Sequence, residues 1–169
     1  MHDEHYNRLY ALLSDLDGVA QSRRYHPEGD ALYHSLQVFQ LAARQTDDVS
    51  LQAAALLHDV GKASSGSDHD EVGADLLVGW VEPRVVWLVR HHLDLLRSPG
   101  KTRRKLRGRS ELSDLERLRR WDLGGRDPSA RVCTIGDALE HLAWHADSFL
   151  IHPQPAGLTG CNNELEPLC

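Results

Sequence analysis

Cysteine, lysine and aromatic residues are scarce in this chain of 169 residues. The three cysteines form no CxxC pair, which is typical of a reducing compartment rather than of a disulfide framework. No segment approaches the roughly 18 consecutive apolar residues of a membrane span. The charged N-terminal segment also lacks the apolar stretch of a secretion signal. We therefore expect a cytoplasmic protein without membrane association.

Positive charge is also in short supply. Lysine and arginine number 19 against 25 for aspartate and glutamate, which gives a net charge of -6. This balance argues against stable nucleic-acid binding. The segment 97–109 is the exception, because it holds seven basic residues and no acidic one. Two interpretations of it remain open: a solvated loop, or a loop that attracts an anionic substrate.

No alternation of apolar and polar residues marks a β-strand, and helical periodicity dominates. Asp30 is placed to cap one of the predicted helices and Pro83 to start another. The predicted helices span residues 5–20, 30–44, 49–59, 69–82, 84–96, 111–122 and 129–151. We predict an all-α fold of about seven helices.

The last eighteen residues, 152–169, differ from the rest. They contain three prolines and two glycines and show little periodicity. We expect a single domain over residues 1–151, followed by a mobile C-terminal tail.

Histidine, in contrast, is abundant, and its eleven copies are scattered rather than gathered in a tag-like run. An unpaired polar group among apolar residues is costly, and imidazole and carboxylate are ligands of divalent metals. The candidates on apolar helical faces or at helix ends are His34, His58, Asp59, His69, His91, His92 and Asp122. Each has a structural explanation by itself, but together they indicate a metal centre. We interpret His26 as a surface residue.

The stretch AALLHDVGK, residues 54–62, ends an apolar run with His58 and Asp59 in succession. Adjacent residues on an ideal helix diverge by about 100°. Both side chains can therefore reach one ion only beyond the helix end, where the last turn loosens. Gly61 supplies the conformational freedom for such a helix stop.

His34, the pair His58–Asp59, and Asp122 resemble the H…HD…D signature of the HD superfamily of metal-dependent phosphohydrolases. The stretches HPEGDALYHSLQ and ALLHDVGK are similar to the HD domains attached to bacterial CCA-adding enzymes and to many small HD phosphohydrolases. The resemblance covers roughly residues 26–145. It implies an HD-domain helical bundle in which these four residues bind a core metal ion.

Two-metal members of the superfamily carry a further histidine before a GA-type helix and another at the end of a V/I-R-x-H pattern. By this resemblance His69 and His92, with His91 as the substitute for His92, bind a second ion, and Asp59 bridges the two. The alternative with one ion leaves His69 on the surface and His92 in the core. The ligand set suits iron or manganese, and cobalt or nickel is also possible.

The resemblance implies hydrolysis of a small anionic substrate, a phosphate ester or a nucleotide, by a metal-activated water. Asp59 and Lys62 are the candidate catalytic residues. Lys62 lies one turn from the ligands and is also a candidate phosphate contact; its structural alternative is pairing with the helix C-terminus. Arg126, in GGRDP, is similar to the GR that follows the last aspartate in several HD phosphohydrolases, and is a second candidate phosphate contact.

The same ligand order also resembles the mixed-valence di-iron HD oxygenases that cleave organophosphonates. The motifs HDEVGADLL, VRHH and LRRWD are similar in both groups. Tyr25 and Glu28 are similar to substrate-gating and recognition residues of the oxygenases, although their spacing to His34 differs by one residue. Lys62 departs from that group, where histidine tends to follow HD-x-G.

Overall fold

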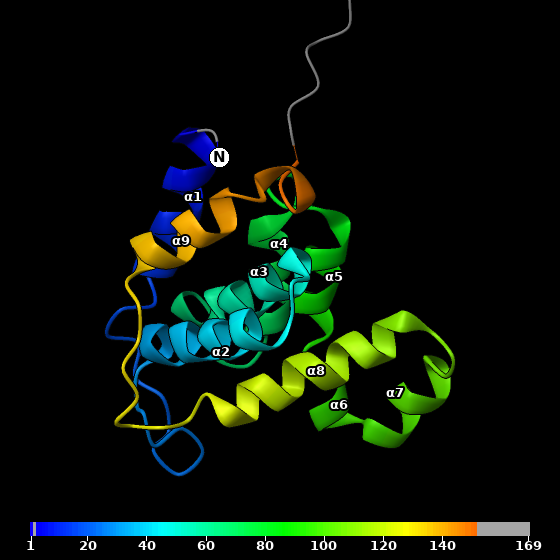
Figure 1. The fold of residues 1–169 in the computed structure, drawn as a ribbon. Helices are drawn as coiled ribbons and strands as arrows, with labels where there is room; N and C mark the ends of the chain where they lie inside the picture. The colour runs from blue at the N-terminus through cyan, green and yellow to red at the C-terminus, as the bar shows by residue number, and fades with distance from the viewer. Residues whose placement is uncertain (2, 152–169) are drawn as a thin grey trace, which may run out of the picture.

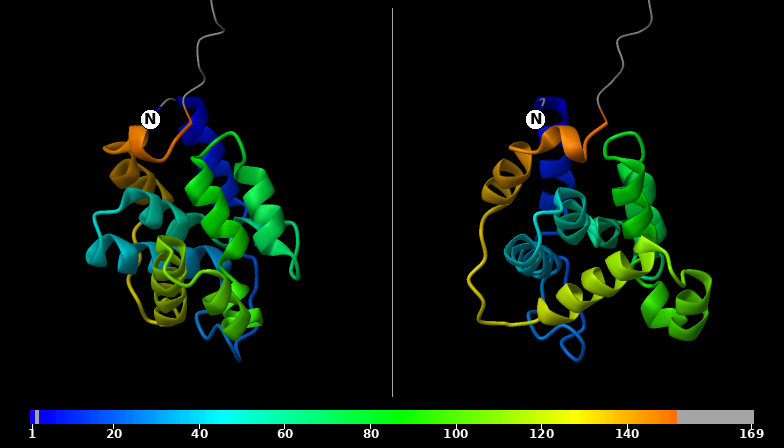
Figure 2. Two further views of the ribbon diagram at one scale, coloured as in Figure 1. Left: turned by 90° about the vertical axis from the view of Figure 1, so that its right-hand side faces the viewer. Right: turned by 45° about the vertical axis from the view of Figure 1, so that its right-hand side comes forward.

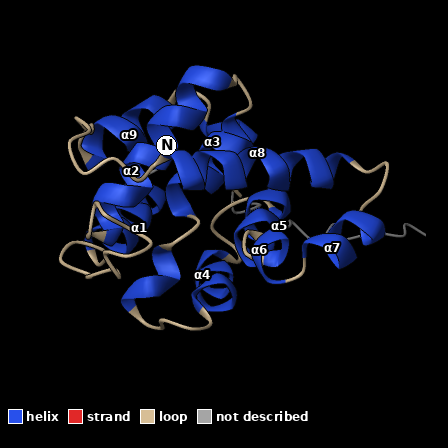
Figure 3. Ribbon diagram, turned by 90° about the horizontal axis from the view of Figure 1, so that it is seen from below, coloured by secondary structure: helices blue, strands red, loops and turns tan. Residues whose placement is uncertain are grey.

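The structure, a computed structural model, describes residue 1 and residues 3–151. Within these residues it has nine α-helices, two 3-10 helices and no β-strand (Figure 1, Figure 3). The α-helices are α1 (Asp3–Ser14), α2 (Ala31–Gln45), α3 (Val49–Leu57), α4 (His69–Leu77), α5 (Pro83–His91), α6 (Asp94–Arg97), α7 (Pro99–Lys105), α8 (Ser110–Gly124) and α9 (Ile135–Ala143). The 3-10 helices span Val60–Ala63 and Ala146–Ser148. The all-α prediction is confirmed, with more and shorter helices than the seven expected.

Helix α3 is the buried centre of the bundle. All of its residues from Ser50 to Leu57 are buried, and α2, α5, α8 and α9 pack against it. A helix that is apolar on nearly every side is stable only in such an interior. Helix α1 lies beside α9, and α6 packs against both α7 and α8 in another part of the molecule (Figure 1, Figure 2). The residues that follow α3 therefore emerge among the surrounding helices.

Most of the predicted helices are shorter than expected, and in two of them the residue that sets the boundary is clear. The helix predicted to reach residue 82 ends at Leu77, because Gly79 turns the chain with a φ of 82°. The helix predicted over 129–151 begins only where Thr134 and Asp137 form a capping box. The apolar residues outside these helix boundaries lie in turns and in a short 3-10 segment, and several of them are buried in the core.

The basic segment 97–109 is largely helical, so its interpretation as a loop is wrong. Pro99 occupies the first turn of α7, where proline favours a helix start. Thr102 and Leu106, four residues apart, are buried, whereas the basic side chains around them are exposed. Two buried positions are enough to attach this short helix to the bundle.

The described helices include none with the length and apolar character that crossing a membrane requires. The tail predicted over 152–169 lies outside the described residues. The division into one domain and a tail therefore stays a prediction.

Candidate metal centre

The six predicted ligand side chains meet at one place in the bundle, although they come from separate segments. One lies in the first turn of α2, two follow the last residue of α3, one begins α4, one follows α5 and one lies in the last turn of α8. In chain order these residues are His34, His58, Asp59, His69, His92 and Asp122. All are buried except Asp122, whose side chain is 14% exposed.

Asp59 lies between two groups of histidines. Its Oδ2 atom is 3.3 Å from Nε2 of His58 and 3.9 Å from Nε2 of His34. Its Oδ1 atom is 3.3 Å from Nε2 of His69 and 3.7 Å from Nε2 of His92. In each group the candidate ligand atoms all lie within 4.8 Å of one another. The arrangement could hold two metal ions that share the Asp59 carboxylate.

Asp122 extends the first of these groups. Its Oδ1 atom lies 3.1 Å from Nε2 of His34, which is the ring nitrogen that also faces Asp59. The first group thus offers two imidazoles and two carboxylates, and the second offers two imidazoles and the shared carboxylate.

Every histidine in these groups has its other ring nitrogen, Nδ1, hydrogen-bonded to a main-chain carbonyl. The acceptors are Gly125 for His34 (2.8 Å), Ala55 for His58 (2.9 Å), Gly66 for His69 (3.0 Å) and Val89 for His92 (2.7 Å). A carbonyl can only accept, so Nδ1 carries a proton, and in the neutral form of each imidazole that binds a metal the lone pair is on Nε2, the nitrogen that faces Asp59. Fixing the tautomer in this way is typical of metal-binding histidines.

Two buried imidazole nitrogens at this place, Nε2 of His58 and Nε2 of His92, have no hydrogen-bond partner within the described residues. Buried polar atoms are rarely left without a partner, because desolvation then goes uncompensated. Nitrogen and oxygen donors that converge in this way are suited to a divalent transition metal. These residues therefore fit a metal centre.

Burial and neighbouring charges set the ionisation of the centre. Burial alone would lower the pKa of His34, but hydrogen bonds with two carboxylates raise it to about 9. For His92, burial and the neighbouring charge of His58 lower the pKa to about 4. Burial alone would raise the pKa of Asp59, but the charges of His58 and Lys62 hold it well below its usual range. Asp59 is therefore an anion at neutral pH, as a bridging metal ligand must be.

The candidate ligands open onto a cleft of about 680 Å³. This volume is within the range of small-molecule binding sites in proteins. Three cationic side chains, those of Lys62, Arg119 and Arg126, line the cleft together with apolar ones. The surroundings of the centre therefore suit a small anionic molecule.

Lys62 and Arg126, the two predicted phosphate contacts, are ion-paired with candidate metal ligands. Nζ of Lys62 lies 2.6 Å from Oδ2 of Asp59. Nη2 of Arg126 lies 3.2 Å from Oδ1 of Asp122, and its Nη1 donates to the main-chain carbonyl of Tyr25 at 2.9 Å. Three of the four predicted substrate contacts, Lys62, Arg126 and Tyr25, line the cleft.

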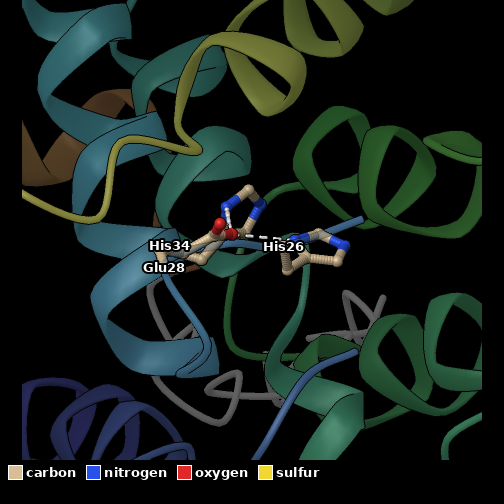
Figure 4. Close-up of side chains that lie close together, drawn as sticks. All are labelled: His26, Glu28 and His34. Carbon is tan, nitrogen blue, oxygen red and sulfur yellow. Dashed lines mark hydrogen bonds and ion pairs between the residues drawn. The ribbon is translucent and has the colours of Figure 1, made fainter. Parts of the chain in front are cut away.

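Glu28 does not line the cleft, and its side chain is fully buried. Its Oε1 atom lies 2.9 Å from Nδ1 of His34 and 2.8 Å from Nδ1 of His26, so the carboxylate joins the two imidazoles (Figure 4). This position behind a candidate ligand argues against the predicted substrate contact. His26, expected on the surface, lines the cleft instead. Its place depends on an irregular segment before α2, for which the sequence carries no periodic signal.

The structure differs from the prediction at two further positions. His91, the predicted substitute for His92, is hydrogen-bonded to Asp94 (Nδ1 to Oδ2, 2.9 Å) and does not line the cleft. Arg119, which no motif in the sequence indicates, does line it. It precedes Asp122 by three residues on α8, a spacing that places both on one helix face.

Gly61 is required for a reason other than the predicted one. Its backbone does not adopt the left-handed conformation that favours glycine. A Cβ atom at this position would lie 2.1 Å from the carbonyl oxygen of His69 and 2.6 Å from the amide nitrogen of Gly73. The absence of a side chain thus lets the turn after Asp59 pack directly against α4, which brings His69 to Asp59.

Comparison with known proteins bears on the same region. A family model described as HD domain matches residues 31–142, which include all six candidate ligands. The multifunctional CCA protein of Nitrosococcus oceani is 43% identical over 60 residues, which make up 36% of this chain and 15% of that protein. Its counterpart in Methylococcus capsulatus is 50% identical over 56 residues, 33% of this chain and 13% of the relative. In Halorhodospira halophila it is 40% identical over 75 residues, 40% of this chain and 18% of the relative.

The aligned segments thus span less than a fifth of each of these relatives. The family model, in contrast, covers most of the present chain. The resemblance seen in the sequence is confirmed: the chain belongs to the HD-domain family, a superfamily of metal-dependent phosphohydrolases.

Proposed function

We propose that this HD-domain protein is a metal-dependent phosphohydrolase that acts on a small phosphate ester or a nucleotide. The observation that carries the proposal is the position of Asp59 among four histidines, each held at Nδ1 by a main-chain carbonyl. Histidines oriented in this way present preset ligand atoms, whereas purely structural histidines have both nitrogens satisfied within the protein. Membership of the HD family supports the reaction class.

The proposed ligands form two overlapping sets. His34, His58, Asp59 and Asp122 would hold a first ion, and Asp59, His69 and His92 would hold a second. When bound, divalent ions polarise a phosphoryl oxygen and lower the pKa of water so that it attacks phosphorus near neutral pH. The nitrogen and oxygen donors suit iron or manganese, and cobalt or nickel is compatible.

Lys62 and Arg126 supply positive charge beside these ligands. Each contacts a ligand carboxylate and lines the cleft, so each is within reach of a phosphate that binds next to Asp59 and Asp122. In this proposal Lys62 neutralises charge that develops on the phosphoryl oxygens during attack. Arg126 binds the phosphate through its planar group of donors. Tyr25, 58% exposed at the cleft, contacts the organic part of the substrate.

Oxidation of an organophosphonate by a di-iron centre is the second candidate function. The observation in its favour is the second group of ligands, Asp59, His69 and His92, which gives room for two ions. Lys62 argues against it, because the oxygenases tend to have histidine at that position. The cationic residues of the cleft suit either substrate, since both carry a phosphorus oxyanion.

The test combines metal analysis with turnover. Protein purified without chelator or histidine tag is analysed for metal by mass spectrometry, and phosphate release is assayed on a panel of phosphate monoesters and nucleotides. The variant Asp59→Asn removes the shared charge but keeps the shape of the side chain. We expect it to lose bound metal and to lower turnover at least about a hundredfold, with helicity unchanged in circular dichroism.

The matched control is Asp15→Asn, which changes the same charge at an exposed position on the chain. It is expected to retain both metal and activity. Unchanged turnover in Asp59→Asn would overturn the proposed mechanism. Two irons per chain, oxygen consumption with an organophosphonate and no phosphate release from any ester would replace it with the oxygenase.

A further inference from the structure

Arg119 is a cation of the cleft for which the described part of the chain offers no partner. It lies on α8, on the face that carries Asp122, and is half-buried. Within the described residues its guanidinium makes no hydrogen bond and no ion pair under the usual distance criteria. A partly desolvated guanidinium without a partner is unfavourable, so an anion that enters the cleft gains by meeting it.

The other two cations of the cleft already have a carboxylate partner. Lys62 is paired with Asp59 and Arg126 with Asp122. Within the described lining of the cleft, Arg119 is therefore the cation whose donors are all available to a bound molecule. Its fork of donors matches a phosphate or carboxylate better than a neutral group.

Beside Arg119 the cleft carries an apolar rim, made up of Tyr25, Leu96 and Leu123. Their side chains are 58%, 57% and 50% exposed, and they come from the segment before α2, from α6 and from α8. The described chain has six large apolar side chains that are exposed, and half of them line this one cleft. Exposed apolar groups gathered at a concave site indicate a ligand with an apolar surface.

Charge and apolar surface are adjacent in this cleft. Leu123 follows Arg119 by four residues on α8, so the two share a helix face. A ligand that satisfies both must carry an anion and a planar or apolar group within one small molecule. A sugar phosphate has the anion, but its hydroxyls would meet the apolar rim. A nucleotide has both, because the base can stack on an aromatic side chain and against leucine.

We propose that Arg119 binds the phosphate of a nucleotide whose base lies against Tyr25, Leu96 and Leu123. The proposal rests on the proposed phosphohydrolase function and names the substrate class of that site. It makes Arg119 a substrate-binding residue and the apolar rim the part of the cleft that selects nucleotides over sugar phosphates.

A matched pair of probes separates the two parts of the site. Adenosine 5′-monophosphate and ribose 5-phosphate share the sugar and the phosphate and differ only by the base. Both are titrated calorimetrically into the full, metal-loaded chain, along with the guanosine, cytidine and uridine monophosphates, while phosphate release is followed in parallel. We expect the best nucleotide to bind at least about tenfold more tightly than ribose 5-phosphate. Equal affinities, or no binding of any probe, would overturn the assignment of the base.

The variant Arg119→Gln tests the phosphate contact. It should weaken binding of the nucleotide and of ribose 5-phosphate alike by about tenfold or more, because both lose a charge-assisted hydrogen bond. Arg120→Gln is the control, since Arg120 is the next residue, is exposed and does not line the cleft. Equal effects of the two substitutions would show that only overall charge matters, and would overturn the contact.

The variant Leu123→Ala tests the rim. It should weaken binding of the nucleotide and leave ribose 5-phosphate unchanged, and a loss for both probes would contradict the apolar subsite. Metal content is measured in each variant and should stay at the wild-type level. If the protein binds no metal and releases no phosphate, the proposed phosphohydrolase function is wrong. If it binds metal and releases phosphate but does not prefer nucleotides, only the nucleotide assignment is wrong.

Discussion

His69 faces Asp59 across 3.3 Å, from Nε2 to Oδ1, and this is not the carboxylate oxygen that His58 faces. One carboxylate therefore presents a different oxygen to each of two histidine groups. A bridging carboxylate is the element that a two-metal site needs and a one-metal site does not. The sequence left both a one-metal and a two-metal site open. The choice between them now depends on whether His69 binds an ion.

We predict that His69→Ala removes one ion and keeps the other. The first group, with His34, His58 and Asp122, does not include His69, so its ion should stay. Metal content measured by mass spectrometry should fall from about two ions per chain to about one. The control is His91→Ala, because His91 adjoins His92 in sequence but does not line the cleft. Retention of both ions in His69→Ala, or the presence of one ion in the wild type, would favour the one-metal alternative.

Gly61→Ala should be strongly destabilising for its size. The added Cβ would meet main-chain atoms of His69 and Gly73 at 2.1 and 2.6 Å, and main-chain atoms in packed helices cannot move aside cheaply. Overpacking of this kind lowers the free energy of unfolding by about 3 kcal/mol. Denaturant unfolding of the wild type and the variant, both with chelator, measures the difference.

The control for this substitution is Gly66→Ala. Gly66 lies in the same connection, and a Cβ there would meet nothing within 4 Å, so a change within about 0.5 kcal/mol is expected. Displacement of α4 in Gly61→Ala should also weaken binding of the ion that His69 holds. Equal stability of the two variants would mean that the turn after Asp59 does not pack as tightly as described.

The ion pair between Arg97 and Asp70 should make the stability of the protein depend on pH. Asp70 is buried beside His69, and Arg97 binds it with Nη1 and, at 3.2 Å, with Nη2. Burial alone would raise the pKa of Asp70, but the hydrogen bonds and charge of Arg97 hold it below its usual value. The folded-state pKa is thus lower than that of the unfolded chain, which is about 4. The stabilisation is fully present above about pH 4 and is lost as the pH falls through the folded-state pKa.

Denaturant unfolding of the metal-free protein tests this dependence. Asp70→Asn should lower the free energy of unfolding by about 1 kcal/mol at pH 7, after allowance for the partial exposure of Arg97. The difference from the wild type should shrink below pH 4. Asp75→Asn, on the same helix but with a side chain 71% exposed, should cost less than about 0.5 kcal/mol. A difference for Asp70→Asn that is constant with pH would exclude the ion pair as its cause.

The candidate ligands could be singled out from the sequence because their signals are local. His58 and Asp59 follow an apolar run, and His69, His92 and Asp122 lie at or near helix ends with recognisable flanking residues. The sequence could not predict which ring nitrogen of each histidine faces the centre. That choice depends on main-chain carbonyls supplied by α3, by the segments before α4 and after α8, and by α5, hence on how the segments pack.

The misassigned features share a different cause. The segment before α2 has no repeating pattern, so nothing in the sequence shows that Glu28 turns inward to His34 while Tyr25 lines the cleft. Helix α7 buries only Thr102, and Leu106 directly after it is the next buried residue, which is too little for a periodic signal. Spacing can reveal a helix face, but it does not reveal which loop covers it.

The structure and the resemblance to the oxygenases give Glu28 different roles. The structure places it behind His34, whereas the resemblance implies a contact with the substrate. Because its carboxylate supports Nδ1 of His34 from behind, Glu28→Ala should weaken metal binding about tenfold to a hundredfold, as loss of such partners commonly does. At saturating metal the KM for substrate should be unchanged. Glu28→Gln should restore much of the metal affinity, since its amide oxygen can accept the same hydrogen bond. Metal titrations and steady-state kinetics separate the two effects. A raised KM with unchanged metal affinity would instead place Glu28 in contact with the substrate, as the resemblance implies.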